Sequence, residues 1–310
     1  MNFLCYGSHG WIGQQVTRVL LARGHRITVG LARCDNYEEL CKELDSVKPH
    51  FVFSSVGRTH GTHSDGQVYT TIDFLELPGN LDLNLRDNFV GPLNLARACK
   101  ERGLKCGYLG TGCIFEYDNV IHKRPSNENE KIDCASLKGF TEEDVPNFFG
   151  SGYSIVKGWT DRQMHTYEDT VLNLRIRMPI SRENNSRDFI TKITTYQKIC
   201  SIANSMTVLP EIIPIMVHMM ENKVTGTYNM CNPGLITHNQ ILDLYIKHVD
   251  PTFKYQNFTP EEQARILKAG RSNNYLETGK LESYCTKNNL LLNDIVSACE
   301  KNLLRRAEAK

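Results

Sequence analysis

The sequence predicts an α/β protein built on a doubly wound parallel sheet, with a smaller, mostly helical lobe at its C-terminal end. A short apolar run at residues 2–6 is followed by a glycine-rich turn and by a helical pattern that reaches Gly24. Apolar runs then alternate with helical stretches as far as residue 180, which is the pattern of βαβ units. Beyond residue 180 the order of elements loosens, as expected where a chain leaves the sheet to build a second lobe.

Length and composition exclude several classes of protein. With 310 residues, 40% of them hydrophobic, the chain can bury a full core in one large domain or two intimate ones. The net charge is +1 and no basic run occurs, which argues against nucleic acid as the main partner. No apolar stretch approaches the roughly 18 residues that a membrane-spanning helix needs. Residues 1–5 fit a strand better than a signal peptide.

The number and spacing of the cysteines indicate the redox state of the compartment in which the protein works. There are eleven, an odd number, and they are scattered without C-x-x-C pairs. This usage fits reduced thiols in a cytosol-like compartment and suggests no zinc site. We therefore expect a cytoplasmic protein without a metal centre.

The glycine-rich turn after the first strand predicts a dinucleotide cofactor and hence a Rossmann-type sheet. Glycines permit a tight turn, close approach of the backbone to a pyrophosphate and close helix packing, and the helix N-terminus supplies a positive dipole end. A lone glycine triplet is often only a loop, but its position between strand and helix favours the cofactor. The residues expected at the cofactor are Gly7, Ser8, Gly10, Trp11, Ile12 and Gly13.

The end of the second predicted strand, residues 26–32, indicates which cofactor. NAD-specific folds usually place an acidic residue there, whereas this sequence has Arg33, with Asp35 slightly later. Arginine suits a 2′-phosphate, so we expect NADPH/NADP+, although a solvated strand-end arginine is the alternative. After the third strand, residues 50–55, we expect Ser55 and Gly57 at the adenosine half of the cofactor.

Tyr153 and Lys157 are four residues apart on a predicted helix that runs to about Tyr167. Side chains at this spacing are neighbours, and an ammonium near a phenol is expected to lower the pKa of the tyrosine. Such a tyrosine is a general acid for carbonyl reduction. The pattern is short, and on its own it favours a surface pair at chance spacing; the glycine-rich turn reverses this and favours a catalytic pair.

Thr111 and Cys113 follow the strand predicted at residues 104–109. If the backbone stays extended, both side chains project from the same face toward the cleft beside Tyr153. The alternative for Cys113 is a small buried hydrophobe. Its position at the carboxyl end of a parallel strand favours function, because such sheets bind ligands there.

Three connecting segments differ in character. Residues 58–80 predict a long loop over the cofactor, and His60 and His63 in it lack further metal ligands nearby. Residues 82–102 predict a helix that Pro92 kinks near its middle. Residues 119–147 predict an irregular excursion with one short turn of helix.

The remaining third of the chain predicts mostly helices. A strand at residues 226–231 is expected to return to the sheet, and the methionines of the preceding helix are expected to fill the core. Helices are predicted at residues 187–200, 210–222, 238–249, 260–268 and 291–306.

Several motifs resemble known families. The glycine turn, Thr111 and the Tyr153/Lys157 pair occur in the order typical of extended short-chain dehydrogenases/reductases. More specific segments resemble the epimerase/reductase half of plant-type UDP-rhamnose synthases, over nearly the whole chain. The plant enzymes also carry an N-terminal 4,6-dehydratase, and residues 58–80 match them poorly. The matching segments are residues 112–118, 146–150, 175–181, 189–192, 204–209 and 271–274.

This resemblance implies a bifunctional enzyme that converts UDP-4-keto-6-deoxy-D-glucose to UDP-L-rhamnose with NADPH. Inversion at carbons 3 and 5 needs a base and an acid on opposite faces, and the resemblance assigns these roles to Cys113 and Lys192. A thiol near a cation suits this role because its pKa of about 8.5 is easily lowered. Thr111 and Tyr153 would bind the enolate oxygen. Tyr153 would then protonate the oxygen at carbon 4, and Lys157 would hold the nicotinamide ribose.

The resemblance also implies a division of labour along the chain. Residues 1–180, with about 201–231 returning, are expected to form the dinucleotide-binding Rossmann domain, and residues 181–310 the lobe that binds the nucleotide sugar. Arg271 and the segment 205–207 would anchor the diphosphate. The substrate-binding residues implied are Asn147, Arg177, Phe189, Ser205, Thr207, Arg271 and Asn274.

Expected partners follow from the same resemblance. A separate 4,6-dehydratase would supply the substrate. Helices at residues 82–103 and 151–168, with Trp159 as an aromatic anchor, would pair in a homodimer, as is common in this fold family.

Three alternatives stay open. A dTDP-4-dehydrorhamnose reductase shares Thr111 and a late segment, residues 276–280. A 4,6-dehydratase needs an acidic pair after the threonine, where Gly112 and Cys113 stand. A non-catalytic cofactor-sensing subunit would lack the tyrosine or the lysine, and both are present.

Overall fold

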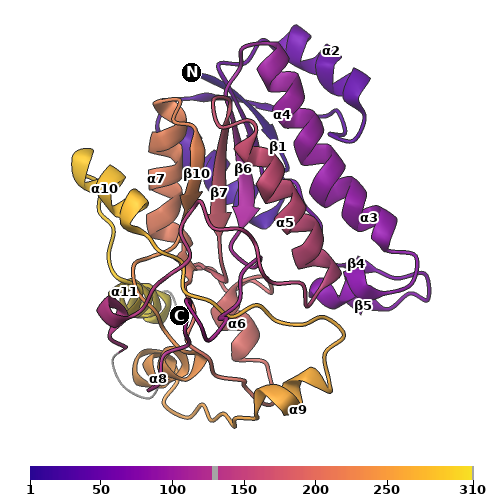
Figure 1. Cartoon of the computed structure of the whole chain (residues 1–310). Helices are drawn as coiled ribbons and strands as arrows, with labels where there is room; N and C mark the ends of the chain where they lie inside the picture. Colours follow the sequence, from indigo (N-terminus) through magenta and orange to yellow (C-terminus); the bar gives the residue numbers. More distant parts are fainter. Residues whose placement is uncertain (128–131, 309–310) are drawn as a thin grey trace. The chain divides into compact units, whose positions relative to one another are not determined.

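The computed structural model describes residues 1–127 and 132–308 (Figure 1). Part of the irregular excursion expected at residues 119–147, namely 128–131, lies outside the described residues. The chain divides into two compact units. The first comprises Met1–Ile114, Phe148–Arg175 and Ile213–Tyr228, and the second comprises Phe115–Asn147, Ile176–Ile212 and Asn229–Lys310.

This division differs from the expected domain boundaries in three places. Residues 115–147 and 176–180 were expected in the first domain but belong to the second unit, and the returning segment is 213–228 instead of about 201–231. The backbone explains the first difference, because the Tyr117 amide donates to the Asn273 carbonyl and Phe140 forms a parallel bridge with Leu276. The excursion therefore pairs with the C-terminal part of the chain.

A six-stranded sheet forms the centre of the first unit, in the order β10-β7-β6-β3-β1-β2. The strands are β1 (Asn2–Tyr6), β2 (Arg26–Val29), β3 (Phe51–Ser54), β6 (Cys106–Thr111), β7 (Val171–Ile176) and β10 (Gly226–Asn229). The pairs β1–β2, β1–β3 and β3–β6 are parallel. The strand order reverses between β1 and β3, which is where open parallel sheets bind ligands at the carboxyl ends of their strands. The predicted doubly wound fold is confirmed.

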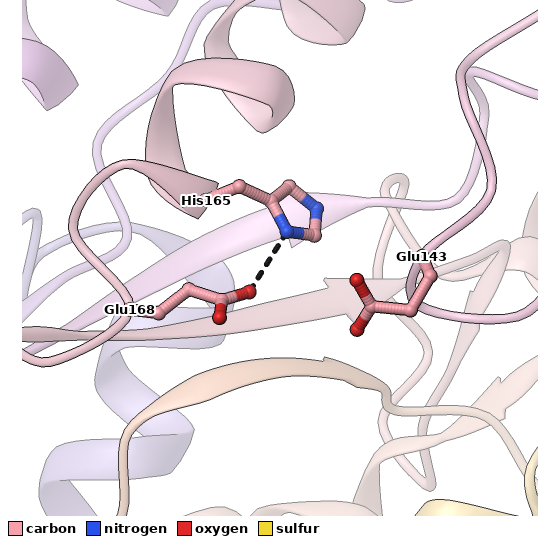
Figure 2. A group of neighbouring side chains, drawn as sticks. All are labelled: Glu143, His165 and Glu168. Carbon is pink, nitrogen blue, oxygen red and sulfur yellow. Dashed lines mark hydrogen bonds and ion pairs between the residues drawn. The ribbon is translucent and has the colours of Figure 1, made fainter.

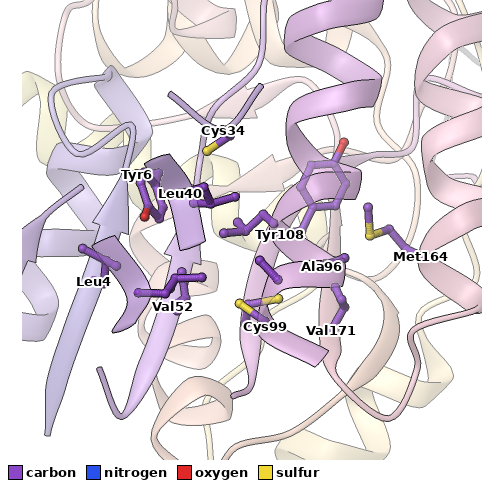
Figure 3. Close-up of a cluster of buried hydrophobic side chains, with 14 residues drawn as sticks. Leu4, Tyr6, Cys34, Leu40, Val52, Ala96, Cys99, Tyr108, Met164 and Val171 are labelled. Carbon is purple, nitrogen blue, oxygen red and sulfur yellow. The ribbon is translucent and has the colours of Figure 1, made fainter. Parts of the chain in front are cut away.

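Helices cover both faces of this sheet (Figure 1). On one face, α2 (Tyr37–Val47), α4 (Gly91–Glu101) and α5 (Gly152–His165) enclose an apolar cluster that includes side chains from β1, β3, β6 and β7 (Figure 3). The other face carries α1 (Trp11–Ala22) and α7 (Leu209–Glu221). Arg23, directly after α1, donates to the carbonyl of Pro214 in α7. Strand alternation produces this arrangement, since successive side chains point to opposite faces.

Local signals set several helix boundaries. Helix α2 begins directly after Asn36, whose side chain accepts a hydrogen bond from the Glu39 amide at 3.3 Å and so caps the helix. The methionines Met216, Met219 and Met220 of α7 are fully buried, so their predicted role in the core is confirmed.

The helix predicted at residues 82–102 contains a different irregularity from the one expected. It consists of α3 (Leu81–Leu85), a π-helical turn at Arg86–Val90 and α4. Pro92 stands in the first turn of α4. The widened turn lies directly before the proline, where a missing amide breaks the regular helical pattern.

The segment at residues 58–80 is not the irregular loop that was expected. It forms an antiparallel pair, β4 (Gly61–Thr62) with β5 (Val68–Tyr69), and a 3-10 helix at Ile72–Glu76. The side chains of Phe74 and Leu75 are buried in a small apolar cluster against which Tyr69 and Tyr153 pack. The apolar residues near the end of the segment thus anchor it. His63 pairs with Asp65 at 3.3 Å.

The second unit contains short elements. Its strands β8 (Pro179–Ile180) and β9 (Thr207–Val208) pair in parallel, and residues 134–136 form the one expected turn of helix. Its helices include α6 (Phe189–Ile193), α8 (His238–His248), α9 (Pro260–Ala264), α10 (Gly279–Lys287) and α11 (Ile295–Glu308).

Several predictions for this unit were wrong. The helix predicted at 187–200 ends at Ile193, because the hydroxyls of Thr194 and Thr195 bond back to carbonyls and Ile199 forms a bridge with Asn257. Helix α10 was not predicted, since its apolar pattern is weak. The helix predicted at 260–268 is shorter and ends at Ala264, and the helix predicted at 291–306 is displaced to Ile295–Glu308.

Two further observations concern the chain as a whole. None of the helices in the described part of the chain is long and apolar enough to cross a membrane. All eleven cysteines are free thiols.

Candidate active site

The glycine-rich turn adopts the shape that a phosphate cradle requires. Gly7 has a φ of 77°, which favours glycine, and its carbonyl accepts from the Gly10 amide at 2.9 Å. A Cβ atom on Gly13 would lie 2.1 Å from that carbonyl, so no side chain fits there. The first turn of α1 contains no acidic residue. Its exposed amides and positive dipole end therefore suit an anion.

The same turn holds two buried polar atoms without a protein partner. These are the hydroxyl of Ser8 and the indole nitrogen of Trp11. Buried polar atoms normally have hydrogen-bond partners, so both are available to a bound group. The predicted turn residues thus fit the diphosphate of a dinucleotide.

Ser55 and Gly57 build the neighbouring turn. The Ser55 hydroxyl donates to the Gly7 carbonyl at 3.1 Å and so joins the two turns. A Cβ atom on Gly57 would lie 3.1 Å from the amide oxygen of Asn88, so this position is closely confined. Both residues shape the site through the backbone.

Arg33 belongs to a network of charges at the end of β2. Its guanidinium lies 2.9 Å from Asp35 and 3.6 Å from Asp87, while its side chain is 59% exposed. Asp87 also accepts from Arg58 at 2.5 Å and from Arg86 at 2.8 Å. Three guanidinium groups thus share two carboxylates. Arg58 and Arg86 come from separate segments that only the fold brings together, so no local pattern indicates that they join Arg33.

Helix α5 carries Tyr153, which is partly buried, and Lys157, which is buried. The helix starts at Ser151, whose hydroxyl accepts from the Ser154 amide at 3.1 Å. The ammonium of Lys157 donates to the hydroxyl of Tyr108 on β6, and a longer contact of 3.5 Å reaches the Leu109 carbonyl. Burial lowers the pKa of Lys157 to about 8, against the opposing effects of Asp161 and Cys113.

The expected lowering of the Tyr153 pKa is wrong for the free protein. Burial raises the pKa of Tyr153, a neighbouring Cys113 raises it further, and only a hydrogen bond with Thr111 opposes the shift. The physical reason is that desolvation disfavours the phenolate, while the ammonium of Lys157 bonds to Tyr108. Tyr153 is therefore held as a protonated phenol.

Thr111 and Cys113 reach Tyr153 by a different route from the one predicted. Strand β6 ends at Thr111 and the chain turns, so the backbone is not extended through Cys113. The Cys113 amide donates to the Thr111 hydroxyl at 3.1 Å, which closes this turn. Both side chains nevertheless act on Tyr153. Four of the five expected catalytic residues thus lie in one unit and share one neighbourhood.

Lys192, the fifth, lies in the second unit on α6. Burial lowers the pKa of this lysine, Arg187 and Arg271 lower it further, and Asp188 opposes them. Arg271 thus lies near enough to Lys192 for its charge to act on the lysine. Arg187 was not anticipated.

The other expected substrate residues are joined to backbone groups of the second unit. Arg177 is fully buried and donates to the Ser272 hydroxyl at 2.8 Å and to its carbonyl at 2.7 Å. The Thr207 hydroxyl accepts from the Arg177 amide at 2.9 Å, and that of Ser205 accepts from the Leu276 amide at 2.9 Å. These contacts hold Arg177, Ser205 and Thr207 in fixed positions within the second unit.

Three members of the expected set remain. The Asn274 amide nitrogen donates to the Phe115 carbonyl at 2.8 Å. Asn147 exchanges two hydrogen bonds with the backbone of Glu116, at 2.9 and 3.0 Å. Phe189 meets the ring of His238 edge-on, with 5.2 Å between ring centres.

At the C-terminal end of α5, His165 and Glu168 form a hydrogen bond of 2.8 Å (Figure 2). Glu143, also drawn there, belongs to the second unit. A histidine and one carboxylate do not make a metal site by themselves, since structural and catalytic metal sites use three or four protein ligands.

Comparisons with known proteins identify the family. No protein-family model matches the chain. An uncharacterised protein of Acanthamoeba polyphaga mimivirus is 48% identical over 283 residues, which are 91% of this chain and 92% of that protein. The bifunctional dTDP-4-dehydrorhamnose 3,5-epimerase/dTDP-4-dehydrorhamnose reductase of Arabidopsis thaliana is 41% identical over 91% of this chain and 87% of its own length. The chain spans 39% of an Arabidopsis trifunctional protein that adds a UDP-glucose 4,6-dehydratase.

Solved structures agree. The crystal structure of a UDP-rhamnose synthase from the same mimivirus has a TM-score of 0.89 at 45% identity, and covers 98% of this chain and 99% of its own. A dTDP-4-dehydrorhamnose reductase from Bacillus anthracis in complex with NADP has a TM-score of 0.74 at 16% identity over 100% of this chain and 99% of its own, which shows a shared fold. With the predicted motifs and two relatives that match along almost their whole length, this chain belongs to the family of nucleotide-sugar 3,5-epimerase/4-reductases.

Proposed function

We propose that this protein converts UDP-4-keto-6-deoxy-D-glucose to UDP-L-rhamnose as a 3,5-epimerase and an NADPH-dependent 4-reductase. The observation that carries the proposal is the gathering of Thr111, Cys113 and Tyr153 in one unit. A simple reductase requires a proton donor but no thiol beside it. A thiol next to the proton donor supports a second reaction in the same place.

The epimerisation is assigned to Cys113 and Lys192. The ketone at carbon 4 acidifies the hydrogens at carbons 3 and 5, and each inversion removes one proton and returns one on the opposite face. Lys192 suits proton transfer because burial and two arginines lower its pKa. Thr111 and Tyr153 would donate hydrogen bonds to the enolate oxygen.

The reduction is assigned to Tyr153 and Lys157. NADPH, when bound, supplies the hydride for carbon 4. Tyr153 gives its proton to the oxygen at carbon 4, and its raised pKa keeps that proton available before the reaction. Lys157 holds the nicotinamide ribose and its charge favours the tyrosinate that remains.

The preference for NADPH rests on the charges around Arg33. Asp35, the nearest candidate for binding ribose hydroxyls, already pairs with Arg33. A 2′-phosphate in this network would gain from three guanidinium groups. These contacts support the phosphorylated cofactor.

The assembly and the location are further parts of the proposal. Trp159 of α5 is 51% exposed, and Leu81 and Val90 add exposed apolar surface on the preceding helical segment. These side chains support a homodimer through α3, α4 and α5, and a monomer mass by light scattering at micromolar concentration would contradict it. Free thiols at all eleven cysteines support a cytoplasmic location. A separate 4,6-dehydratase would supply the substrate.

The deciding experiment compares substrates. The protein is incubated with NADPH and either UDP- or dTDP-4-keto-6-deoxyglucose, and the product sugar is identified by NMR. We expect a rhamno-configured sugar, with the higher kcat/KM for the UDP substrate. Reduction without inversion at carbons 3 and 5 would reject the epimerase activity, and a higher kcat/KM for dTDP would favour the thymidine-linked alternative.

A further inference from the structure

Lys157 is a buried cation whose ammonium has two hydrogen-bond acceptors, the Tyr108 hydroxyl and the Leu109 carbonyl. Lys157 is only 5% exposed, and a buried ammonium requires hydrogen-bond partners to stay charged. The Tyr108 hydroxyl is the close acceptor, and the Leu109 carbonyl lies at 3.5 Å. The ammonium also lies 4.5 Å from the centre of the Tyr108 ring. One tyrosine thus contacts this charge with both its hydroxyl and its ring.

The nearest carboxylate is already engaged. Asp161 stands one helical turn beyond Lys157 on α5. Its two oxygens accept from Arg175 at 2.8 and 2.7 Å, and Asn173 donates to it at 2.8 Å. The attraction of Asp161 for Lys157 is therefore shared with Arg175, and Tyr108 remains the direct partner.

We propose that Tyr108 is a positioning residue for the reduction: its hydroxyl and ring hold the ammonium of Lys157 in place and charged. The proposal rests on the proposed function, in which Lys157 serves the reductive half. It adds a second tyrosine to the site, one that acts on the lysine instead of the substrate.

The position of Tyr108 separates this role from packing. Strand alternation places Cys106 and Tyr108 on the face of β6 that builds the apolar cluster (Figure 3). A phenylalanine would fill the same volume in that cluster, so packing alone does not explain the hydroxyl. Burial raises the pKa of Tyr108 well above its ordinary value. The phenol thus stays neutral and serves as an acceptor, not as a counter-ion.

The charged and titratable groups around Lys157 set the direction of a pH effect. Asp161 faces it from α5, Tyr108 from β6 and Cys113 from the turn after β6, while Tyr153 precedes it by one turn. Removal of the Tyr108 hydroxyl costs the ammonium more than the neutral amine, because a hydrogen bond from a charged donor is the stronger one. The pKa of Lys157 must then fall, and the lysine loses its charge at a lower pH.

The test is Tyr108→Phe, with Tyr6→Phe as the matched control. Tyr6 is a buried tyrosine of the same cluster whose hydroxyl donates to Glu43 at 2.8 Å. In apo protein labelled at the ε-carbon of lysine, Lys157→Met identifies the Lys157 resonance. We expect this resonance to titrate near 8 in the parent and about half a pH unit lower or more in Tyr108→Phe. Tyr6→Phe should leave it unchanged.

Activity provides the second measurement. In Tyr108→Phe we expect kcat for reduction to fall about tenfold at pH 7.5, with the high-pH limb moved to lower pH, because a charge-assisted hydrogen bond is lost. Solvent deuterium should still enter carbons 3 and 5 at the parental rate. An unchanged titration and an unchanged pH limb in Tyr108→Phe would overturn the role of Tyr108, as would equal shifts in both variants. Absence of reduction and of deuterium uptake in the parent would instead reject the proposed function.

Discussion

Two lysines, Lys157 buried in the first unit and Lys192 partly buried in the second, differ in what surrounds them. Burial lowers the pKa of both. Around Lys157 the neighbours that act on this pKa, Asp161 and Cys113, oppose the shift. Around Lys192 two arginines, Arg187 and Arg271, reinforce it. The neighbouring charges thus favour the cation at Lys157, whereas the two arginines oppose the cation at Lys192 and favour release of its proton.

The largest effects are expected at the residues proposed to work with each lysine, namely Cys113 with Lys192 and Tyr153 with Lys157. Cys113→Ala should keep the fold and NADPH binding but lose about 10²–10⁴-fold of solvent deuterium exchange at carbons 3 and 5.

Tyr153→Phe should mainly block reduction, by a similar factor, because hydride transfer to carbon 4 then lacks its proton donor. Both rates are measured by NMR on the same substrate.

A matched control is available in the first unit. Cys41, on α2, is also a partly buried free thiol, and Cys41→Ala should leave both rates at parental values. If Cys113→Ala still exchanges deuterium at the parental rate and yields a rhamno-configured product, the thiol is a packing residue. The base would then have to be another group.

The same contrast marks the limits of sequence reasoning. The glycine turn, the Asn36 cap and the Tyr153/Lys157 spacing are local signals, and the sheet, α2 and α5 follow from them. The bond between Lys157 and Tyr108 joins residues 49 positions apart, so no local pattern reveals it. Nor does a local pattern reveal that Arg187 and Arg271 act on Lys192.

The elements that were predicted poorly have weak local signals. Helix α10 buries only Leu281 and Cys285, which leaves little apolar periodicity to detect. The segment at residues 58–80 is polar except near its end, where Phe74 and Leu75 anchor it to its cluster. The turn at Cys113 depends on the Thr111 hydroxyl, which accepts a hydrogen bond from the Cys113 amide and overrides the extended backbone that the strand pattern suggests.

An effect of intermediate size is expected at Arg33, the arginine proposed to bind the 2′-phosphate of the cofactor. Arg33→Ala should reduce the ratio of kcat/KM for NADPH over NADH by roughly 10–100-fold, the value of one charge-assisted contact to a phosphate. The exposed Arg305 of α11 provides the control, since Arg305→Gln should leave this ratio unchanged. If Arg33→Ala does not change the ratio either, the assignment of the 2′-phosphate site is wrong.

The smallest effect, and the sharpest test of the contrast between the lysines, concerns Arg187. Removing this positive charge takes away a repulsion that lowers the pKa of Lys192, so Arg187→Gln should raise that pKa. Lys192 is the proposed acid and must be protonated, so the high-pH limb of deuterium exchange should move to higher pH, with a gain of about threefold on that limb. The high-pH limb of reduction, which depends on Lys157, should stay in place because Arg187 does not act on that lysine. Arg187→Lys, which keeps the charge, should restore the parental exchange profile. A shift of both limbs in Arg187→Gln, or of neither, would show that the arginines do not set the proton affinity of Lys192.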